Sequence, residues 1–191
     1  MKTDLRIIKS KNAIENAFIN LVEIKGFQSI TIKEIAEKAM VNRNTIYLNY
    51  GTKEEILESI VKTSFFNHFG NLTTETFRKI GLNKKKIEDL FKKLFIVIDE
   101  NIELYRILFT DSSSSGYLRT ELTKLRKALE NWIKPTPTNK IRASFLMNGI
   151  IGVVSNYITL AVGTAEDNVK ILTDLTLSNL RHMSYTKKIW N

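Results

Sequence analysis

The feature that most constrains the fold is a helix, a break and a second short helix within residues 31–50, TIKEIAEKAMVNRNTIYLNY. Thr31 and Glu34 have the spacing of a capping box, in which two side chains bond the free N–H groups at a helix start. Asn42 suits the N-cap of a second helix, which we expect to end near Asn49. The segment therefore predicts two short helices joined by a tight turn.

Folded in this way, the segment has an apolar side, made of Ile35, Ala36, Ala39, Val41 and Ile46. The second helix then turns Arg43, Asn44 and Tyr47 outward on one face. That helix is about 10 Å long at about 1.5 Å per residue, and the major groove of B-DNA is about 12 Å wide. This geometry is typical of a helix-turn-helix that binds double-stranded DNA.

The outward side chains have the chemistry that base recognition needs. Arg43 can pair with the O6 and N7 atoms of guanine, and Asn44 with the N6 and N7 atoms of adenine. No acidic residue occurs from Lys38 to Lys53, as expected of a surface that faces phosphates. The predicted DNA-binding residues are Thr31, Lys33, Asn42, Arg43, Asn44, Thr45, Tyr47, Asn49, Tyr50 and Lys53.

The rest of the chain repeats apolar residues at helical spacing, and neither a strand pattern nor an internal repeat is visible. We predict an all-α fold of about nine to ten helices. A three-helix helix-turn-helix DNA-binding domain occupies residues 1–50. A fourth helix, at about 52–69 and opened by a capping box from Thr52 to Glu55, connects it to a larger helical effector-binding and dimerisation domain at 51–191.

Composition excludes several classes of function. The chain has no cysteine and two histidines, so disulfides, thiolate sites and a metal site are not expected. No nucleophile triad, carboxylate pair or glycine-rich phosphate loop is visible, so we expect neither an enzyme nor a cofactor. The net charge is +9, but residues 1–60 hold nine basic against eight acidic residues, so bulk charge does not locate a DNA site. The N-terminus lacks a signal-peptide pattern, which favours a cytoplasmic protein.

The stretch FLMNGIIGVVSNYITLAVG, residues 145–163, is apolar nearly all round. A membrane span needs about 20 predominantly apolar residues, and this run is marginal and interrupted by Asn148 and Asn156. Gly149 and Gly152 would let another helix approach closely. We interpret the stretch as core plus subunit interface, covered on every side, and not as a membrane segment.

Side chains of the C-terminal half could also line a ligand cavity, although aromatic stripes at helical spacing are more often simple core. The candidate pocket residues are Phe65, His68, Phe69, Phe91, Phe95, Tyr105, Phe109, Asn148 and Tyr157.

The stretch GFQSITIKEIAEKAMVNRNTIYLNYGTKEEIL resembles the DNA-binding domain of the TetR family of transcriptional regulators. The likeness lies in the Gly-Phe turn, Thr-Ile, Ile-Ala, an Arg-x-Thr-x-Tyr helix and a Thr-Lys-Glu helix start, over about residues 10–60. Two positions depart from the family pattern. Met40 stands where the turn usually has glycine, which costs about 1 kcal/mol if the backbone is left-handed. Leu48-Asn49-Tyr50 replaces His-Tyr-Phe, so phosphate contacts at 48 are not assumed.

The resemblance implies a repressor that binds a near-palindromic operator as a homodimer, paired through its last two helices at about 139–185. It also implies that an unknown small-molecule effector binds the C-terminal domain and lowers operator affinity. An alternative is that this domain binds a partner protein in place of a small molecule, which the basic surplus beyond residue 60 supports.

Overall fold

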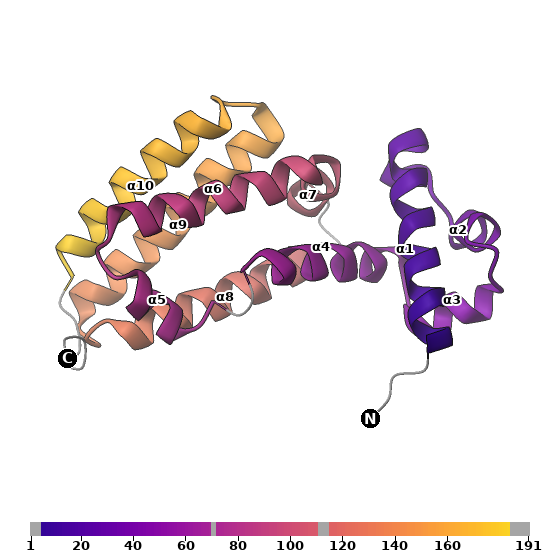
Figure 1. Cartoon of the computed structure of the whole chain (residues 1–191), viewed down its shortest axis with the longest axis horizontal. Helices are drawn as coiled ribbons and strands as arrows, with labels where there is room; N and C mark the ends of the chain where they lie inside the picture. The colour runs from indigo at the N-terminus through magenta and orange to yellow at the C-terminus, as the bar shows by residue number, and fades with distance from the viewer. Residues whose placement is uncertain (1–4, 70–71, 111–114, 184–191) are drawn as a thin grey trace.

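A computed structural model describes residues 5–69, 72–110 and 115–183; the side chains of 65–69, 115–119 and 121 lie outside this description. Within these ranges the chain forms ten α-helices, one short 3-10 helix and no strand (Figure 1). The N-terminal elements are α1 (Leu5–Lys25), η1 (Phe27–Ser29), α2 (Ile32–Lys38), α3 (Arg43–Asn49) and α4 (Lys53–Phe69). The others are α5 (Thr74–Ile80), α6 (Lys84–Glu100), α7 (Ile102–Thr110), α8 (Ser115–Trp132), α9 (Pro137–Leu160) and α10 (Ala165–Arg181). The predicted all-α class is confirmed.

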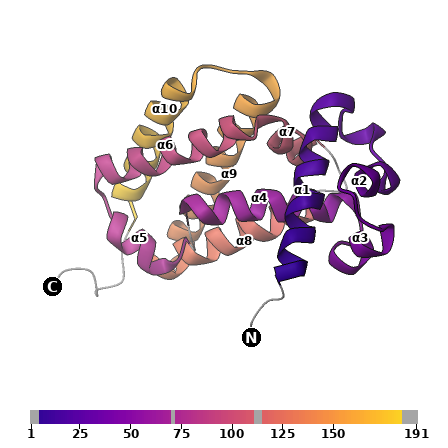
Figure 2. The same ribbon diagram turned by 45° about the vertical axis from the view of Figure 1, so that its right-hand side comes forward.

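The first three helices form a small unit at one end of the molecule, with α2 and α3 on one side of α1 (Figure 2). Helix α1 buries the apolar stripe that the sequence predicts, namely Ile14, Ala17, Phe18, Leu21 and Val22. Gly26 ends this helix with φ at 72°, a left-handed value that glycine adopts without steric cost. The predicted capping box of Thr31 and Glu34 and the predicted N-cap at Asn42 are both confirmed.

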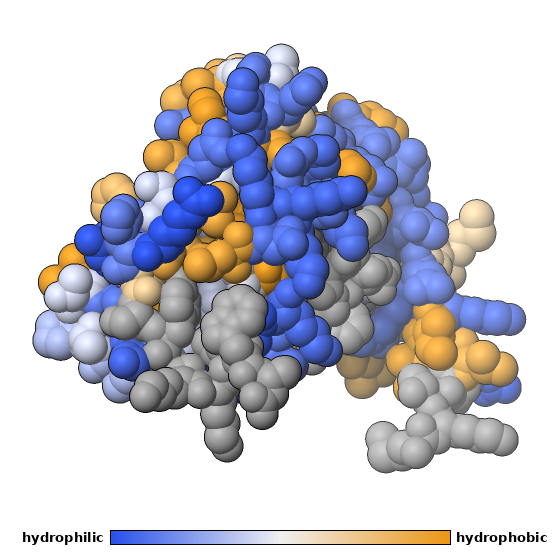
Figure 3. Space-filling view, turned by 60° about the vertical axis from the view of Figure 1, so that its left-hand side comes forward, coloured by the Kyte–Doolittle hydropathy of each residue, from blue (hydrophilic) through white to orange (hydrophobic). Residues whose placement is uncertain are grey.

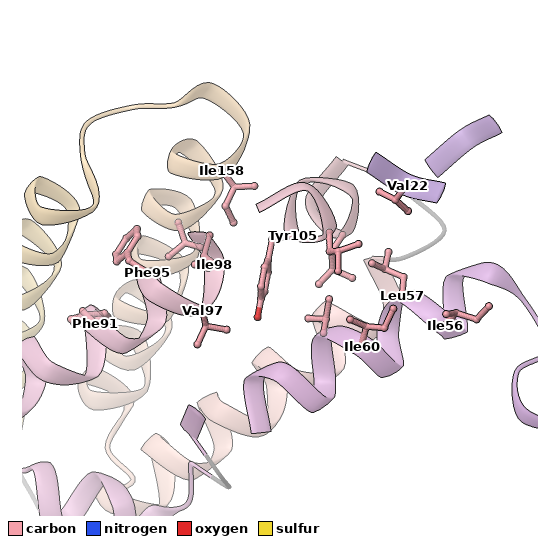
Figure 4. Packing of buried hydrophobic residues seen from close by; sticks show 14 of the residues in the cluster. Val22, Ile56, Leu57, Ile60, Phe91, Phe95, Val97, Ile98, Tyr105 and Ile158 are labelled. Atoms are coloured by element: carbon pink, nitrogen blue, oxygen red, sulfur yellow. The ribbon is translucent and has the colours of Figure 1, made fainter. Parts of the chain in front are cut away.

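Helix α4 leads from this unit into the larger one (Figure 1). Its start differs in one bond from the predicted capping box. The Thr52 hydroxyl accepts the N–H of Glu55 at 3.2 Å, but the Glu55 carboxylate accepts the N–H of Gly51 at 2.8 Å, one residue before the expected partner. In Figure 4, Leu57 of α4 lies beside Val22 of α1, so the two units share an apolar junction.

Helices α5 to α10 surround the larger part of the hydrophobic core, which continues from the N-terminal unit. Helices α6 and α10 pack along one another, and Lys84 pairs with Asp174 at 2.9 Å near the start of α6. Helix α9 starts at Pro137, after the Thr136 N-cap. Proline suits this position because an N–H group in the first turn has no bonding partner within the helix. Residues 111–114, between α7 and α8, lie outside the described residues, as does the predicted end of the last helix near 185.

Helix α9 packs on the core along one face only, so the expected covering of its other face by a second subunit stays a prediction. In the described part of the chain it is the one helix with the length and apolar composition of a membrane span, a property it shares with core helices of soluble proteins. One face packs on α7, α8 and α10. The opposite face and the adjoining part of α10 carry exposed apolar or small residues: Ile141, Phe145, Gly149, Gly152, Leu160, Ile171 and Leu175.

Some of the basic residues beyond residue 60 have partners on the same chain. Lys92 pairs with Glu88 on the same helix, and the Lys86 ammonium donates to the backbone carbonyl of Lys79 at 2.8 Å. On the face shown in Figure 3, hydrophilic residues dominate and hydrophobic residues form separate groups among them. This surface does not form one uninterrupted apolar patch.

Candidate nucleic-acid interface

Helix α3 packs on the protein core along one face and exposes its opposite face to solvent. Ile46 is fully buried beneath it, whereas Arg43, Asn44 and Tyr47 are exposed on the other side. The Asn42 side chain accepts the N–H of Asn44 at 2.8 Å and so caps the helix. The structure therefore places the three predicted base-reading side chains together on one solvent-facing surface, free of any ionic partner among the described residues.

The turn before α3 is a Schellman motif with methionine at its left-handed position. Met40 has φ at 54°, which is the left-handed case for which the sequence implied a cost, and its side chain is 93% exposed. The Met40 N–H bonds the Glu37 carbonyl at 3.2 Å. The Val41 N–H bonds the Ala36 carbonyl at 3.0 Å, which completes the pattern. A non-glycine residue thus bears the local strain at the bend that aims α3.

Thr31 is committed to its helix cap. Its hydroxyl accepts the N–H of Glu34 at 3.3 Å and donates to the Glu34 carboxylate at 3.0 Å. Hydrogen bonds from the Lys25 ammonium, the Thr31 backbone and the Thr31 hydroxyl lower the pKa of the Glu34 carboxyl to about 2. A phosphate contact from the Thr31 side chain would have to replace its bond to this carboxylate. The predicted role of Thr31 therefore narrows to capping α2.

Lys53 faces inward, which corrects its predicted role as a phosphate ligand. Its ammonium donates to the carbonyls of Phe27, Gln28 and Ile30 at 2.9, 3.3 and 3.3 Å. It also lies 4.5 Å from the centre of the Phe27 ring. Because an ammonium has three donors, these bonds use its whole capacity. Lys53 therefore joins the start of α4 to η1.

Tyr50 is also removed from the predicted DNA-facing set. Its side chain is 4% exposed, and its hydroxyl donates to the Glu15 carboxylate at 2.8 Å. Burial, together with this bond to Glu15, raises the pKa of Tyr50. The same Glu15 oxygen accepts the Ser59 hydroxyl at 2.8 Å. Glu15 thus connects α1, the end of α3 and α4 through one carboxylate.

The remaining predicted residues lie around α3. Lys33 and Asn42 are exposed, and Thr45 and Asn49 are half-buried. Lys33 makes only a long, exposed contact of 3.9 Å with Glu37, and the Asn49 amide donates to the Thr45 carbonyl at 2.7 Å. Leu48, 86% exposed next to Tyr47, was not predicted as a contact residue. An apolar side chain there can meet a thymine methyl group, but no polar pattern in the sequence signals it.

A second candidate site is a cavity of about 460 Å³ within the larger unit. Of the predicted pocket residues, Phe91, Tyr105 and Phe109 line it. Phe95 and Tyr157 do not: their rings pack edge to face at 4.8 Å, and the Tyr157 hydroxyl donates to Asp99.

Asn148 is also outside the cavity, because it lies on the exposed face of α9. The side chains of Phe65, His68 and Phe69 fall outside the described residues. The prediction missed the contributions of Phe77 and Thr176 to the lining. Their amphipathic spacing is shared with core residues, so the sequence contains no signal that would select them.

Comparison with known proteins agrees with this geometry. Residues 17–60 match the sequence model described as "Bacterial regulatory proteins, tetR family". Two relatives come from Bacillus subtilis (strain 168), and both are described as uncharacterized HTH-type transcriptional regulators. YxbF is 32% identical over 71 residues, which are 37% of this chain and 19% of that protein. YdgC is 25% identical over 124 residues, 63% of each chain. The matches thus span less than two thirds of either relative.

Solved structures share the fold over nearly the whole chain. NalD of Pseudomonas aeruginosa, the secondary repressor of the MexAB-OprM multidrug efflux pump, superposes with a TM-score of 0.66 at 14% identity, covering 96% of this chain and 100% of that one. The dihydroxyacetone kinase operon activator DhaS gives 0.64 at 17% identity, covering 93% and 99%. One of these proteins is a repressor and the other an activator, so the shared architecture does not decide the sign of regulation.

Proposed function

We propose that this chain, which belongs to the TetR family of bacterial DNA-binding transcriptional regulators, forms a homodimeric repressor that leaves its operator when a small molecule occupies the C-terminal cavity. The family consists of regulators and not enzymes. The observation that carries the proposal is the support of α3 by buried Ile46, with Arg43, Asn44 and Tyr47 left open on the far side.

In this proposal each exposed residue of α3 contacts a different group of the DNA. Arg43 pairs with guanine and Asn44 with adenine in the major groove, while Tyr47 contacts a phosphate or a base edge. Four further residues position the helix on the backbone: Lys33, Asn42, Thr45 and Asn49. Local charge favours this assignment, because no acidic residue occurs from Lys38 to Lys53 and the Glu34 carboxylate is bonded to Lys25 and Thr31.

The exposed side of α9 and α10 supports pairing with a second copy. Ile141 and Phe145 are each 70% exposed, and Ile171 and Leu175 are more than half exposed. At Gly149 and Gly152, an added Cβ would meet no atom of the same chain, so the surface there is open to a close-packed helix. Two copies that bury this side against each other would form a four-helix bundle and place two α3 helices on an operator of matching symmetry.

Helix α4 provides the connection between cavity and DNA in this proposal. At its start, Lys53 holds the η1 carbonyls and Ser59 bonds Glu15 of α1. Farther along, Val61 and Lys62 line the cavity. A ligand that displaces this part of α4 would therefore move the recognition unit. The coupling requires that the ligand bind more tightly to the conformation with lower DNA affinity.

The alternative of a protein partner has less support. A cavity of 460 Å³ lies within the usual range for small-molecule sites, about 300–1,000 Å³. Lys84, Lys86 and Lys92, which contribute to the basic surplus, are bonded to groups of the same chain. A pull-down at moderate salt that recovers a stoichiometric protein partner would favour the alternative instead.

The test begins with selection of bound duplexes from a randomised library, followed by titration of the selected site. We expect Arg43→Ala to weaken binding about 10- to 100-fold and to relax base preference at one position per half-site. Arg78→Ala, an exposed arginine of α5 away from α3, is the matched control and should bind as the parent does. Absence of any DNA binding by the purified protein at low salt contradicts the proposal.

A further inference from the structure

The cavity is elongated along α6. One stripe of this helix, made of Ile87, Leu90, Phe91, Leu94 and Ile98, forms part of its lining. At about 1.5 Å of rise per residue, the segment from Ile87 to Ile98 is about 16 Å long. Helices α4, α5, α7, α8 and α9 contribute further apolar residues, among them Phe77, Leu125 and Ile150. The space therefore fits a long, narrow and mainly apolar molecule.

Two buried hydroxyl groups interrupt this apolar lining. Tyr105 is 6% exposed and Thr176 is 8% exposed, and neither hydroxyl oxygen has a hydrogen-bond partner among the residues that the structure describes. Figure 4 shows Tyr105 in the space between Ile98 of α6 and Ile60 of α4. Burial raises the pKa of the Tyr105 phenol, so it remains protonated and can donate a hydrogen bond. Buried polar groups are normally satisfied, so these two covered oxygens offer hydrogen bonds to a ligand that displaces the atoms over them.

The two hydroxyls lie toward opposite ends of α6. The ion pair of Lys84 and Asp174 places that turn of α10, and with it Thr176, near the start of α6. Tyr105 belongs to α7, which follows the end of α6 at Glu100. A polar group at one end of a ligand can therefore bond Thr176, and a polar group at the other end can bond Tyr105.

The charge of the lining selects among ligands of this shape. No Asp or Glu occurs among the described residues that line the cavity, whereas Lys62 and Lys124 do line it. Both lysines are exposed, which places them at its mouth. A cation entering this space would lose its hydration without gaining a carboxylate partner. A neutral group would meet the hydroxyls, and an anion would also be attracted by the lysines.

We infer that the cavity binds an elongated, mainly apolar molecule with a neutral or anionic hydrogen-bonding group, and that it rejects cations of the same shape. Binding itself does not depend on DNA, but the role of this molecule as an effector rests on the proposed function above. Tyr105 and Thr176 bond the polar atoms of the ligand, and the α6 stripe contacts its apolar body.

The test is calorimetric titration of the full-length protein with three probes of equal chain length: lauric acid, lauryl alcohol and laurylamine, each below its aggregation threshold. We expect saturable binding of one molecule per chain for the acid and the alcohol, and at least about tenfold weaker binding of the amine. Equal or tighter binding of the amine overturns the inference, and so does failure of all three probes to bind.

Matched variants test the assigned residues. Tyr105→Phe and Thr176→Val remove one hydroxyl each while keeping the side chain's shape, and at least one of them should weaken the alcohol about fivefold. Leu94→Trp should fill the cavity and abolish binding. Tyr157→Phe removes a hydroxyl from a side chain that does not line the cavity, so it should leave ligand affinity unchanged. Unaltered affinity in both hydroxyl variants overturns the assignment.

Measurements on the same purified protein distinguish failure of the ligand inference from failure of the proposed function. DNA affinity is measured without probes, and probe affinity without DNA. A protein that binds the selected DNA but none of the probes contradicts the ligand inference alone. A protein that binds the acid and the alcohol but no DNA contradicts the proposed function and leaves the ligand class standing.

Discussion

The two ends of the molecule treat their polar groups in opposite ways. Between residues 5 and 64 no described side chain leaves a buried nitrogen or oxygen without a hydrogen-bond partner. Beyond residue 100, buried polar atoms without a hydrogen-bond partner among the described residues occur in Tyr105, Arg142, Thr173, Thr176 and Asn179. The N-terminal unit is internally satisfied, whereas the C-terminal unit keeps hydrogen-bonding capacity inside and an apolar face outside.

This difference fits two distinct tasks. A unit that reads DNA by a rigid helix must hold α3 in one orientation, and the bonds of Lys53, Tyr50 and Thr31 serve that purpose. In the proposed function the C-terminal unit binds a ligand and a second copy of the chain, and for that it must leave an apolar face and a cavity open. Polar side chains whose hydrogen bonds are made within the N-terminal unit therefore hold the recognition helix in place. Buried polar groups without hydrogen bonds in the C-terminal unit indicate where we expect a ligand to bind.

The sharpest test of this comparison is truncation of one apolar side chain in each unit. Ile46→Ala should lower the free energy of unfolding by about 2–5 kcal/mol and abolish DNA binding, because a fully buried side chain under α3 is lost. Leu94→Ala, at the wall of an existing cavity, should cost only about 1 kcal/mol. Urea denaturation measures both. Equal losses would mean that the two cores are packed alike.

The second test separates an internal lysine from a surface lysine. Lys53→Met keeps the aliphatic stem but removes three bonds to backbone carbonyls, so we expect a loss of about 1–3 kcal/mol in the free energy of unfolding. Lys33→Met should leave stability nearly unchanged and reduce the salt dependence of DNA binding by about one counterion. If Lys53→Met instead left stability unchanged and reduced the salt dependence of DNA binding, Lys53 would be a phosphate ligand after all.

The third test compares two left-handed residues, one in each unit. Met40 has φ at 54° at the turn before α3, and Ala161 has φ at 52° at the end of α9. Glycine at either position should raise the free energy of unfolding by about 1 kcal/mol, since it removes the Cβ conflict. Thermal unfolding of Met40→Gly and Ala161→Gly measures this. A strong loss for Met40→Gly would show that its exposed side chain has a packing role.

The smallest expected effect is a pH dependence at the start of α2. The pKa of Glu34 is lowered from 4.5 to about 2 by the Lys25 ammonium and by Thr31. A carboxyl whose pKa is lower in the folded state stabilises the protein above about pH 4.5, and this contribution is lost as pH falls toward 2. Glu34→Gln should flatten the fall of melting temperature in that window. An unchanged slope would mean that the exposed pair is fully screened by solvent.

Prediction from sequence succeeded where the signal is local. The capping box of Thr31 and Glu34, the N-cap of Asn42 and the left-handed Met40 depend on residues a few positions apart. It failed at Lys53 and Tyr50, whose partners are distant in the chain: Lys53 bonds η1, and Tyr50 bonds Glu15. A basic or aromatic residue near a recognition helix looks the same in sequence whether it faces solvent or protein.

The lining of the cavity also depends on packing between distant helices, which the sequence does not predict. Phe91, Phe95 and Tyr105 all lie on amphipathic helices, yet Phe95 packs against Tyr157 while the other two line the cavity. Helical spacing predicts that these residues face inward. It does not distinguish a filled interior from an open one, because that depends on how neighbouring helices approach.

The sequence by itself determined the all-helical class, the tight turn before α3 and the outward face of Arg43, Asn44 and Tyr47, because caps, periodicity and backbone preference act over a few residues. Tertiary structure alone decided that Lys53 and Tyr50 serve the scaffold, that a hollow follows α6, and that one side of α9 stays open. These outcomes depend on contacts between helices far apart in the chain, where small shifts in packing determine whether a side chain meets protein, solvent or empty space.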